Sequence, residues 1–165
     1  MELWDIYDKD KKRTGRTMKR DDWHMKEGDY HLSVLGVIMR PDGKFLITRR
    51  AEDKGWAPGW WEVSGGAALA GEDSFDAVLR EINEETGLDV SGCEGGLLFS
   101  YHRENPGDNY FVDVYRFLVD FTEEDVILQE EETSEYMIAD LKQIDVLGNQ
   151  GIFLHYNSIK GAFVI

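Results

Sequence analysis

The stretch from Ser74 to Thr86 constrains the fold most, because it has the pattern of a single amphipathic helix with a defined end. At about 100° of rotation per residue, three apolar side chains fall within about 60° of Phe75 on the helix surface. These are Val78, Leu79 and Ile82. Gly87 follows directly, and a glycine in this place is typical of a helix C-cap. The pattern predicts a helix that packs one apolar face against a core.

Three glutamates gather away from this apolar stripe: Glu81, Glu84 and Glu85. Like charges four residues apart destabilise a helix by roughly 0.2–0.5 kcal/mol, and acids near the C-terminal end oppose the helix dipole. Most glutamate-rich helix surfaces are only solvated acidic faces, but a locally unfavourable arrangement is also frequent at functional sites. Carboxylate oxygens are the ligands of hard cations such as Mg²⁺. The helix therefore carries a candidate metal site.

The rest of the chain alternates apolar, β-branched stretches with turn residues, which predicts strands around this helix. Residues 2–7 and a second short segment after Thr14-Gly15 predict an N-terminal β-hairpin within residues 1–28. Further strands are predicted at 30–39, 44–49, 60–63, 97–102, 110–120 and 135–138, short helices at 139–147 and 151–159, and a loop around Gly65, Gly66 and Gly71. Strands dominate and helices are inserted, so the expected class is α+β with packed sheets.

Composition narrows the possible partners. The 165 residues suit one domain, and 33 acidic against 18 basic residues give a formal net charge of −15. Such a surface repels nucleic acid and anionic membranes, so neither is an expected partner. The single Cys93 excludes an internal disulfide framework and suits a reducing compartment. The N-terminus has no signal-peptide pattern and no apolar run is long enough to span a bilayer, so we expect a cytoplasmic protein.

The helix and the loop before it together carry a specific motif. Gly66, five residues, Glu72, seven residues and then the run Arg80–Leu88 resemble the Nudix box at every defining position. The preceding Pro58-Gly59-Trp60-Trp61 is similar to the segment that usually comes before the box, although Ser64 stands where many members have proline. The resemblance implies a single Nudix domain over residues 1–165, with the box at 66–88. It also implies an α/β/α sandwich with a mixed central sheet.

The same resemblance implies a chemistry, the hydrolysis of a diphosphate linked to another moiety with Mg²⁺ or Mn²⁺ as cofactor. The implied metal ligands are Glu81, Glu84, Glu85 and the Gly66 carbonyl. Glu72 and Arg80 are implied as supporting residues that orient these ligands. A divalent cation also offsets the repulsion between an acidic protein and a polyanionic substrate. The general base is expected to be Glu85 or an acid from a later loop, where Glu131 and Glu132 are candidates.

Four residues outside the box are candidates for binding a small diphosphate substrate, for which a nucleoside diphosphate derivative is favoured. Arg49 and Arg50 end a strand near the expected cleft, and arginine binds phosphate in a bidentate manner. A plain strand-end charge is the alternative for both. Trp56 is a candidate for stacking on a ring, and His31 begins the long strand at 30–39 as a substrate-side or metal-side group or a simple strand-end residue.

Two other functions stay open at this stage. The N-terminal half, including Gly28-Asp29-Tyr30-His31, resembles the isopentenyl-diphosphate isomerase-like branch of Nudix proteins. True isomerases have an essential cysteine just before the box, whereas this chain has Val63-Ser64-Gly65-Gly66-Ala67 there. A non-catalytic nucleotide-binding module is the second alternative, which an intact box disfavours. The N-terminal hairpin also offers an edge strand through which a homodimer can form.

Overall fold

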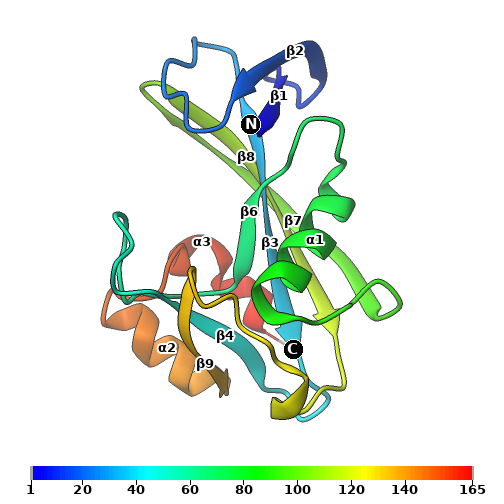
Figure 1. Ribbon diagram of the computed structural model, residues 1–165, viewed down its shortest axis with the longest axis vertical. Helices are drawn as coiled ribbons and strands as arrows, with labels where there is room; N and C mark the ends of the chain where they lie inside the picture. The colour runs from blue at the N-terminus through cyan, green and yellow to red at the C-terminus, as the bar shows by residue number, and fades with distance from the viewer. Residues whose placement is uncertain (1, 165) are drawn as a thin grey trace.

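The computed structural model describes residues 2–164, which form two sheets, three α-helices and two 3₁₀ turns (Figure 1). The strands are β1 (Leu3–Tyr7), β2 (Arg13–Lys19), β3 (His31–Met39), β4 (Phe45–Arg50), β5 (Trp61–Glu62), β6 (Ser64–Ala67), β7 (Glu94–Asn105), β8 (Asp108–Leu118) and β9 (Thr133–Ala139). The helices are α1 (Ser74–Thr86), α2 (Leu141–Asn149) and α3 (Tyr156–Ile159), and the 3₁₀ turns are η1 (Glu123–Asp125) and η2 (Lys160–Phe163).

The main sheet contains parallel and antiparallel strand pairs, and two of its strands separate along one edge of β3. Its strand order is β5-β4-β3-β8-β7, with β6 also paired to β3 and β9 to β4. β3 runs parallel to β8 along its whole length. On its other edge, β3 pairs with β6 over residues 33–36 but with β4 only over residues 38–39. β4 and β6 therefore diverge from a shared neighbour, and this divergence makes room for a cavity.

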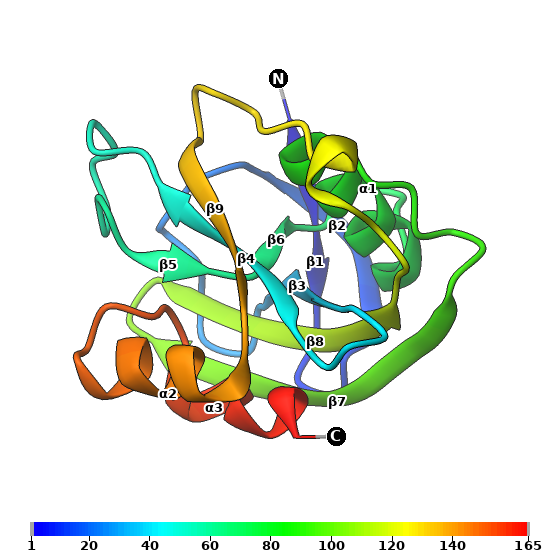
Figure 2. The same cartoon turned by 90° about the horizontal axis from the view of Figure 1, so that it is seen from below.

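Helices cover both faces of this sheet (Figure 2). α1 packs on one face, where its buried Val78 and Ile82 meet Val34 of β3 in one hydrophobic core. The residues of α2 and α3 belong to a second core on the other face, with Ile144 and Ile159 at its centre. This arrangement confirms the α+β class and the three-layer α/β/α sandwich with a mixed central sheet.

The N-terminal hairpin of β1 and β2 forms its own small sheet, as predicted, and lies over one end of the main sheet (Figure 1). Tyr7 and Tyr30 exchange two backbone hydrogen bonds, of 2.8 and 2.9 Å. In the tip between β1 and β2, the Lys11 ammonium donates to the buried carboxylate of Asp113 on β8. These contacts tie the hairpin to β3 and β8.

Helix α1 matches its predicted bounds, with an Asp73 side chain that caps its N-terminus and Gly87 in the left-handed conformation at its C-cap. The buried stripe differs from the prediction. Ala77 is fully buried, whereas Phe75 is 41% exposed and only borders the core, at 6.1 Å from the Tyr115 ring centroid. The buried residues of α1 are Ala77, Val78, Ile82 and Thr86, so the buried face is rotated away from Phe75, which lies at its margin.

Two further predictions of local structure were wrong. Residues 64–67 form strand β6 rather than a loop. Gly65 permits this because a Cβ there would lie 2.3 Å from the Val34 carbonyl oxygen, so only glycine lets the strands approach so closely. The helix predicted over residues 151–159 is confined to α3, because Gly151 adopts a positive φ and Phe153 pairs with Trp61 in an isolated bridge.

Candidate active site

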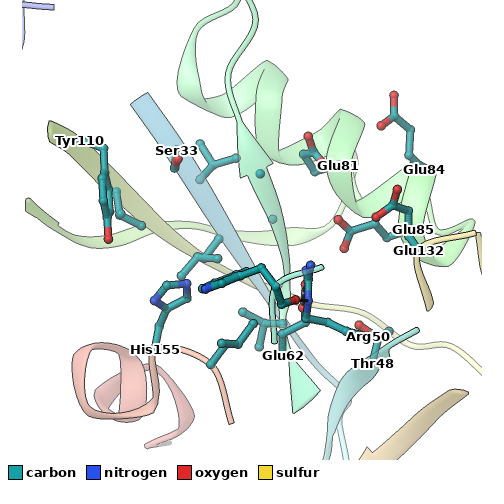
Figure 3. A pocket seen from close by; sticks show the side chains of 18 of the residues that line it. Ser33, Thr48, Arg50, Glu62, Glu81, Glu84, Glu85, Tyr110, Glu132 and His155 are labelled. Carbon is teal, nitrogen blue, oxygen red and sulfur yellow. Dashed lines mark hydrogen bonds and ion pairs between the residues drawn. The ribbon is translucent and has the colours of Figure 1, made fainter. Parts of the chain in front are cut away.

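A cavity of about 850 Å³ opens where β4 and β6 diverge (Figure 3). Its floor is the face of the sheet that alternate residues of β3 and β8 share, including Ser33, Tyr110 and Val112. Glutamates of α1 border one end, whereas Tyr110 and His155 lie toward the opposite end (Figure 3). The cavity thus has an acidic end and an aromatic end, and both are accessible from solvent.

The acidic end contains the three glutamates of the motif. Burial raises the pKa of Glu81, and the pKa of Glu85 lies well above its ordinary value. For Glu85 the main cause is shielding from water, followed by the nearby negative charges of Glu81 and Glu62. Glu84 lies on the exposed side of the same helix. This end of the cavity therefore concentrates negative charge that lacks a full counter-charge.

Arg80 organises these carboxylates from within the same helix. Its guanidinium donates two hydrogen bonds to Glu72, of 2.8 and 2.9 Å, and a third of 3.2 Å to the Ala67 carbonyl. The remaining Nη1 donates to Glu81 at 3.0 Å and to Glu84 at 3.3 Å. Glu72 and Arg80 thus fix two of the cavity carboxylates, and the hydrogen bonds to Glu72 raise the pKa of the guanidinium further above its ordinary value.

The backbone of Gly66 in β6 packs closely against the Glu81 carboxylate. A Cβ at this position would lie 2.6 Å from one Glu81 carboxylate oxygen and 2.8 Å from its Cδ. The backbone can approach the carboxylate because glycine leaves this space open. Neighbouring carboxylates are oxygen donors that suit Mg²⁺ or Mn²⁺, and a backbone carbonyl is a further donor of this kind.

The oxygen atoms of these residues are chemically suited to a divalent cation, although the side chains do not converge on one point. Across residues 2–164, no three His, Cys, Asp or Glu side chains converge into a metal-binding group. The Arg80 guanidinium contacts one carboxylate oxygen of Glu81 and one of Glu84. A bound cation would use the carboxylate oxygens that Arg80 does not contact, while the guanidinium orients the two side chains.

The two candidate arginines have different positions. Arg50 lines the cavity with a side chain only 18% exposed, and it pairs with the equally buried Glu62 at 3.2 Å. Its Nε donates to the Trp56 carbonyl at 3.0 Å. Arg49 points away from the cavity and is occupied by hydrogen bonds or ion pairs to Gly59, Glu52 and Glu135. The structure therefore brings Arg50 to the site but does not bring Arg49 there.

The two aromatic candidates, Trp56 and His31, also differ in how exposed they are. Trp56, in the loop between β4 and β5, is 60% exposed and lines the cavity, with the Arg50 guanidinium 5.1 Å from its ring centroid. His31 borders the cavity but is only 5% exposed. Its ring stacks on Trp4 at 4.3 Å, and its Nε2 lies 3.1 Å from Asp108 Oδ1. His31 is thus a buried residue that positions Asp108 rather than an open contact.

Of the two candidate bases in the later loop, only Glu132 borders the cavity. Its carboxylate pairs with Lys54 of the β4–β5 loop. Glu131 does not line the cavity, so Glu85 and Glu132 are the candidates that the structure brings near it.

The cavity residues that were not expected from the sequence include Glu62, Asp108 and His155. His155 lies in the cavity wall with its ring 6.4 Å from that of Trp56. Period-two alternation along residues 108–112 could have placed Asp108 on the same face as Tyr110 and Val112. Nothing local marks His155, because the turn after α2 brings it to the site.

Sequence and structure comparisons place these features in a known family. The family model described as NUDIX domain matches residues 29–156. The chain belongs to the Nudix family. An uncharacterized Nudix hydrolase of Listeria monocytogenes is 34% identical over 167 residues, which cover 99% of this chain and 94% of that protein.

Solved structures share the Nudix fold. A protein named DR0079 from Deinococcus radiodurans superposes with a TM-score of 0.71 at 21% identity, covering 90% of each chain. A MutT protein from Methanosarcina mazei gives 0.66 at 26% identity, covering 84% of this chain and 96% of that one. The expected enzyme class, a Nudix pyrophosphohydrolase, is confirmed by these relatives.

Two other features bear on the alternatives. Cys93 lies in the turn after α1, partly buried against the core on the α1 side, and does not line the cavity. The position of the isomerase cysteine is occupied by the glycine-rich β6. No helix within residues 2–164 is both long and apolar enough to cross a membrane.

Proposed function

We propose that this Nudix hydrolase cleaves the diphosphate linkage of a small nucleoside diphosphate derivative with the help of Mg²⁺ or Mn²⁺. The observation that carries the proposal is the Glu81–Glu85 pair, whose carboxyl pKa values are raised at the end of an open cavity. Two shielded carboxyls in contact are unfavourable unless a cation or a proton neutralises them. A divalent cation supplies that neutralisation and also binds diphosphate oxygens.

The proposed cation ligands are Glu81, Glu84, Glu85 and the Gly66 carbonyl. When bound, the ion withdraws charge from the diphosphate and makes water more acidic. Arg80 and Glu72 hold the carboxylates in place, because the planar guanidinium reaches Glu72, Glu81 and Glu84 at once. Substituting either residue would leave the ligands less well oriented.

Glu85 is the proposed general base. In the hydrolysis, the oxygen of a water molecule forms a bond to one phosphorus atom, and the bond between that phosphorus and the bridging oxygen breaks. The water proton goes to a Glu85 carboxylate oxygen. Glu85 lies at the same end of the cavity as the other proposed cation ligands, whereas Glu132 is paired with Lys54, and this favours Glu85 as the base.

Arg50 and Trp56 are the proposed substrate-binding side chains. The Arg50 guanidinium sits inside the cavity wall and can donate to a phosphate when it turns from Glu62. The exposed Trp56 ring offers a flat apolar surface to the group attached to the diphosphate. A Trp56→Leu variant is expected to raise KM for nucleotides and to leave KM for inorganic triphosphate unchanged.

The test is phosphate or nucleotide release from a panel of nucleoside triphosphates, dinucleoside polyphosphates and sugar nucleotides. We expect activity that requires Mg²⁺ and falls at least about 100-fold in both Glu84→Gln and Glu85→Gln. Glu124→Gln is the matched control, since this exposed glutamate lies outside the cavity. A loss of only a few-fold in both cavity variants contradicts the proposal, as does nucleotide binding without turnover across the panel.

A further inference from the structure

Asp108 is a carboxylate held in a fixed orientation at the aromatic end of the cavity. It is the first residue of β8, after the turn that joins β7 to β8, and it lines the cavity two residues before Tyr110. Its side chain is 33% exposed, so the carboxylate is both anchored and accessible. Residues 108 and 110 lie on the same face of the strand, which brings the Asp108 carboxylate beside the Tyr110 ring.

His31 determines how Asp108 is held. The imidazole is locked between Trp4, which stacks on it, and Tyr110, whose ring centroid lies 5.6 Å away. Nδ1 is buried and has no hydrogen-bond partner within the described part of the chain. The proton therefore belongs on Nε2, where it is donated to Asp108 Oδ1 at 3.1 Å. Burial lowers the pKa of His31, which keeps the ring neutral.

This bond leaves most of the accepting capacity of Asp108 unused. A carboxylate accepts about four hydrogen bonds and donates none. Within residues 2–164, no donor bonds to Asp108 Oδ2. The nearby cation, Arg20, also lines the cavity, but it pairs with Glu2 and Asp21. A ligand edge that meets the Asp108 carboxylate must therefore present hydrogen-bond donors.

The distance to the glutamates suits a nucleotide. Leu35 of β3 lies beside Gly65 in the sheet, at the acidic end, and His31 lies four residues earlier on the same strand face. At roughly 3.3 Å per residue, these positions are about 13 Å apart. A diphosphate at the glutamates thus leaves room for a sugar and puts its base near Tyr110 and Asp108.

We propose that the Asp108 carboxylate reads the edge of this base and selects one with two adjacent N–H donors. This inference rests on the proposed function, because it assigns the base of the same substrate. Guanine presents N1–H beside its 2-amino group, so a carboxylate can accept both hydrogen bonds at once. Uracil places its single N–H between two carbonyl oxygens, and adenine and cytosine place a ring acceptor beside the amino group. Each of these bases puts a lone pair against the carboxylate.

Hydrolysis of GTP, ITP and UTP tests this selection, since GTP and ITP differ only in the 2-amino group. A hydrogen bond to a charged group corresponds to a factor of roughly 10 or more in affinity. We therefore expect kcat/KM for GTP to exceed that for ITP by about 10-fold or more, and UTP to be poorer still. Asp108→Asn should abolish the preference, because one acceptor becomes a donor.

Asp42→Asn is the matched control, because Asp42 also lies in a hairpin turn, is partly exposed and bonds a neighbouring side chain outside the cavity. It should keep the preference of the unmodified protein. If Asp108 only anchors the turn, Asp108→Asn will lower the melting temperature and reduce activity on GTP and ITP by the same factor. That result overturns the inference.

Equilibrium binding of GDP and IDP, followed by tryptophan fluorescence, separates this inference from the proposed function. Hydrolysis of diphosphates with equal binding of GDP and IDP overturns base selection and leaves the proposed function intact. Tighter binding of GDP, lost in Asp108→Asn, with no hydrolysis of any diphosphate supports base selection and rejects the proposed function. Failure of GDP to bind rejects base selection.

Discussion

The Gly66→Ala variant best separates an effect on activity from an effect on the stability of the fold. Gly66 lies on β6 against Glu81, and its φ is not in the left-handed region, so alanine fits the backbone. The added Cβ would lie 2.6 Å from Glu81 Oε1 and 2.8 Å from Glu81 Cδ. The atoms that must give way belong to the end of a flexible side chain, so the carboxylate moves and the strand stays.

The size of the movement follows from these contacts. An ordinary contact begins at 3.4 Å, so the carboxylate oxygen must withdraw by about 0.8 Å. A misplacement of about 1 Å in a catalytic group can cost roughly 100-fold in rate. We expect kcat/KM to fall about 100-fold in Gly66→Ala, while the free energy of unfolding changes by less than about 1 kcal/mol, because alanine restricts the unfolded chain.

The neighbouring Gly65→Ala variant is the control. Its Cβ would lie 2.3 Å from the Val34 carbonyl oxygen and 2.6 Å from Leu35 Cδ2, and a paired strand cannot yield as a side chain does. Overpacking of this kind costs about 1–3 kcal/mol. The assays are Mg²⁺-dependent phosphate release, Mg²⁺ titration of the rate and urea denaturation. Full activity in Gly66→Ala, or a stability loss equal to that of Gly65→Ala, refutes the reasoning.

Three further variants probe other contacts. Arg80→Lys removes the fork that holds Glu72, so kcat/KM should fall at least about 10-fold, and a double variant with Glu72→Gln should lose little more in a steady-state assay. Lys11→Met leaves the buried Asp113 carboxylate without its ammonium partner. Because Lys11 is partly exposed, we expect the free energy of unfolding to fall by about 1–2 kcal/mol in urea denaturation. An unchanged denaturation midpoint contradicts this prediction. His31 has a pKa below its ordinary value, so the unfolded chain takes up its proton first and stability is lost as pH falls through about 6.5. The melting temperature should therefore drop less in His31→Gln than in the unmodified protein between about pH 7.5 and about pH 5.5, and parallel curves argue against it.

Helix α1 was predictable from sequence because its signals are local. The N-cap, the apolar spacing and Gly87 all lie within the segment that they define. Strand β6 was missed because its glycines are explained only by β3, which lies about 30 residues earlier in the chain and runs close beside it. Close approach between distant segments leaves no local signal.

The residues of the site that belong to the local motif were predictable from sequence, whereas those that reach the cavity through tertiary packing were not. The motif identified the glutamates, Arg80 and Gly66, which share a helix and the strand before it. Arg49 and Arg50 are adjacent in sequence but face opposite sides of β4, and only the paired strands β5 and β9 decide which one faces the cavity. His155 and Asp108 reach the cavity through tertiary packing. The proposed homodimer through the hairpin edge stays a prediction that gel filtration can test.

The alternation of side chains along β3 has a consequence for how this enzyme can evolve. His31, Ser33 and Leu35 face the cavity side, whereas Leu32 and Val34 belong to the core beneath α1. Of the first set, His31 and Leu35 also pack against buried residues, so Ser33 is the position where substitution can alter ligand preference with the least effect on stability. Insertion of one residue would exchange the two sets and put polar groups into the core. During evolution, β3 can therefore change by substitution of single residues, whereas insertions and deletions are tolerated in the loops.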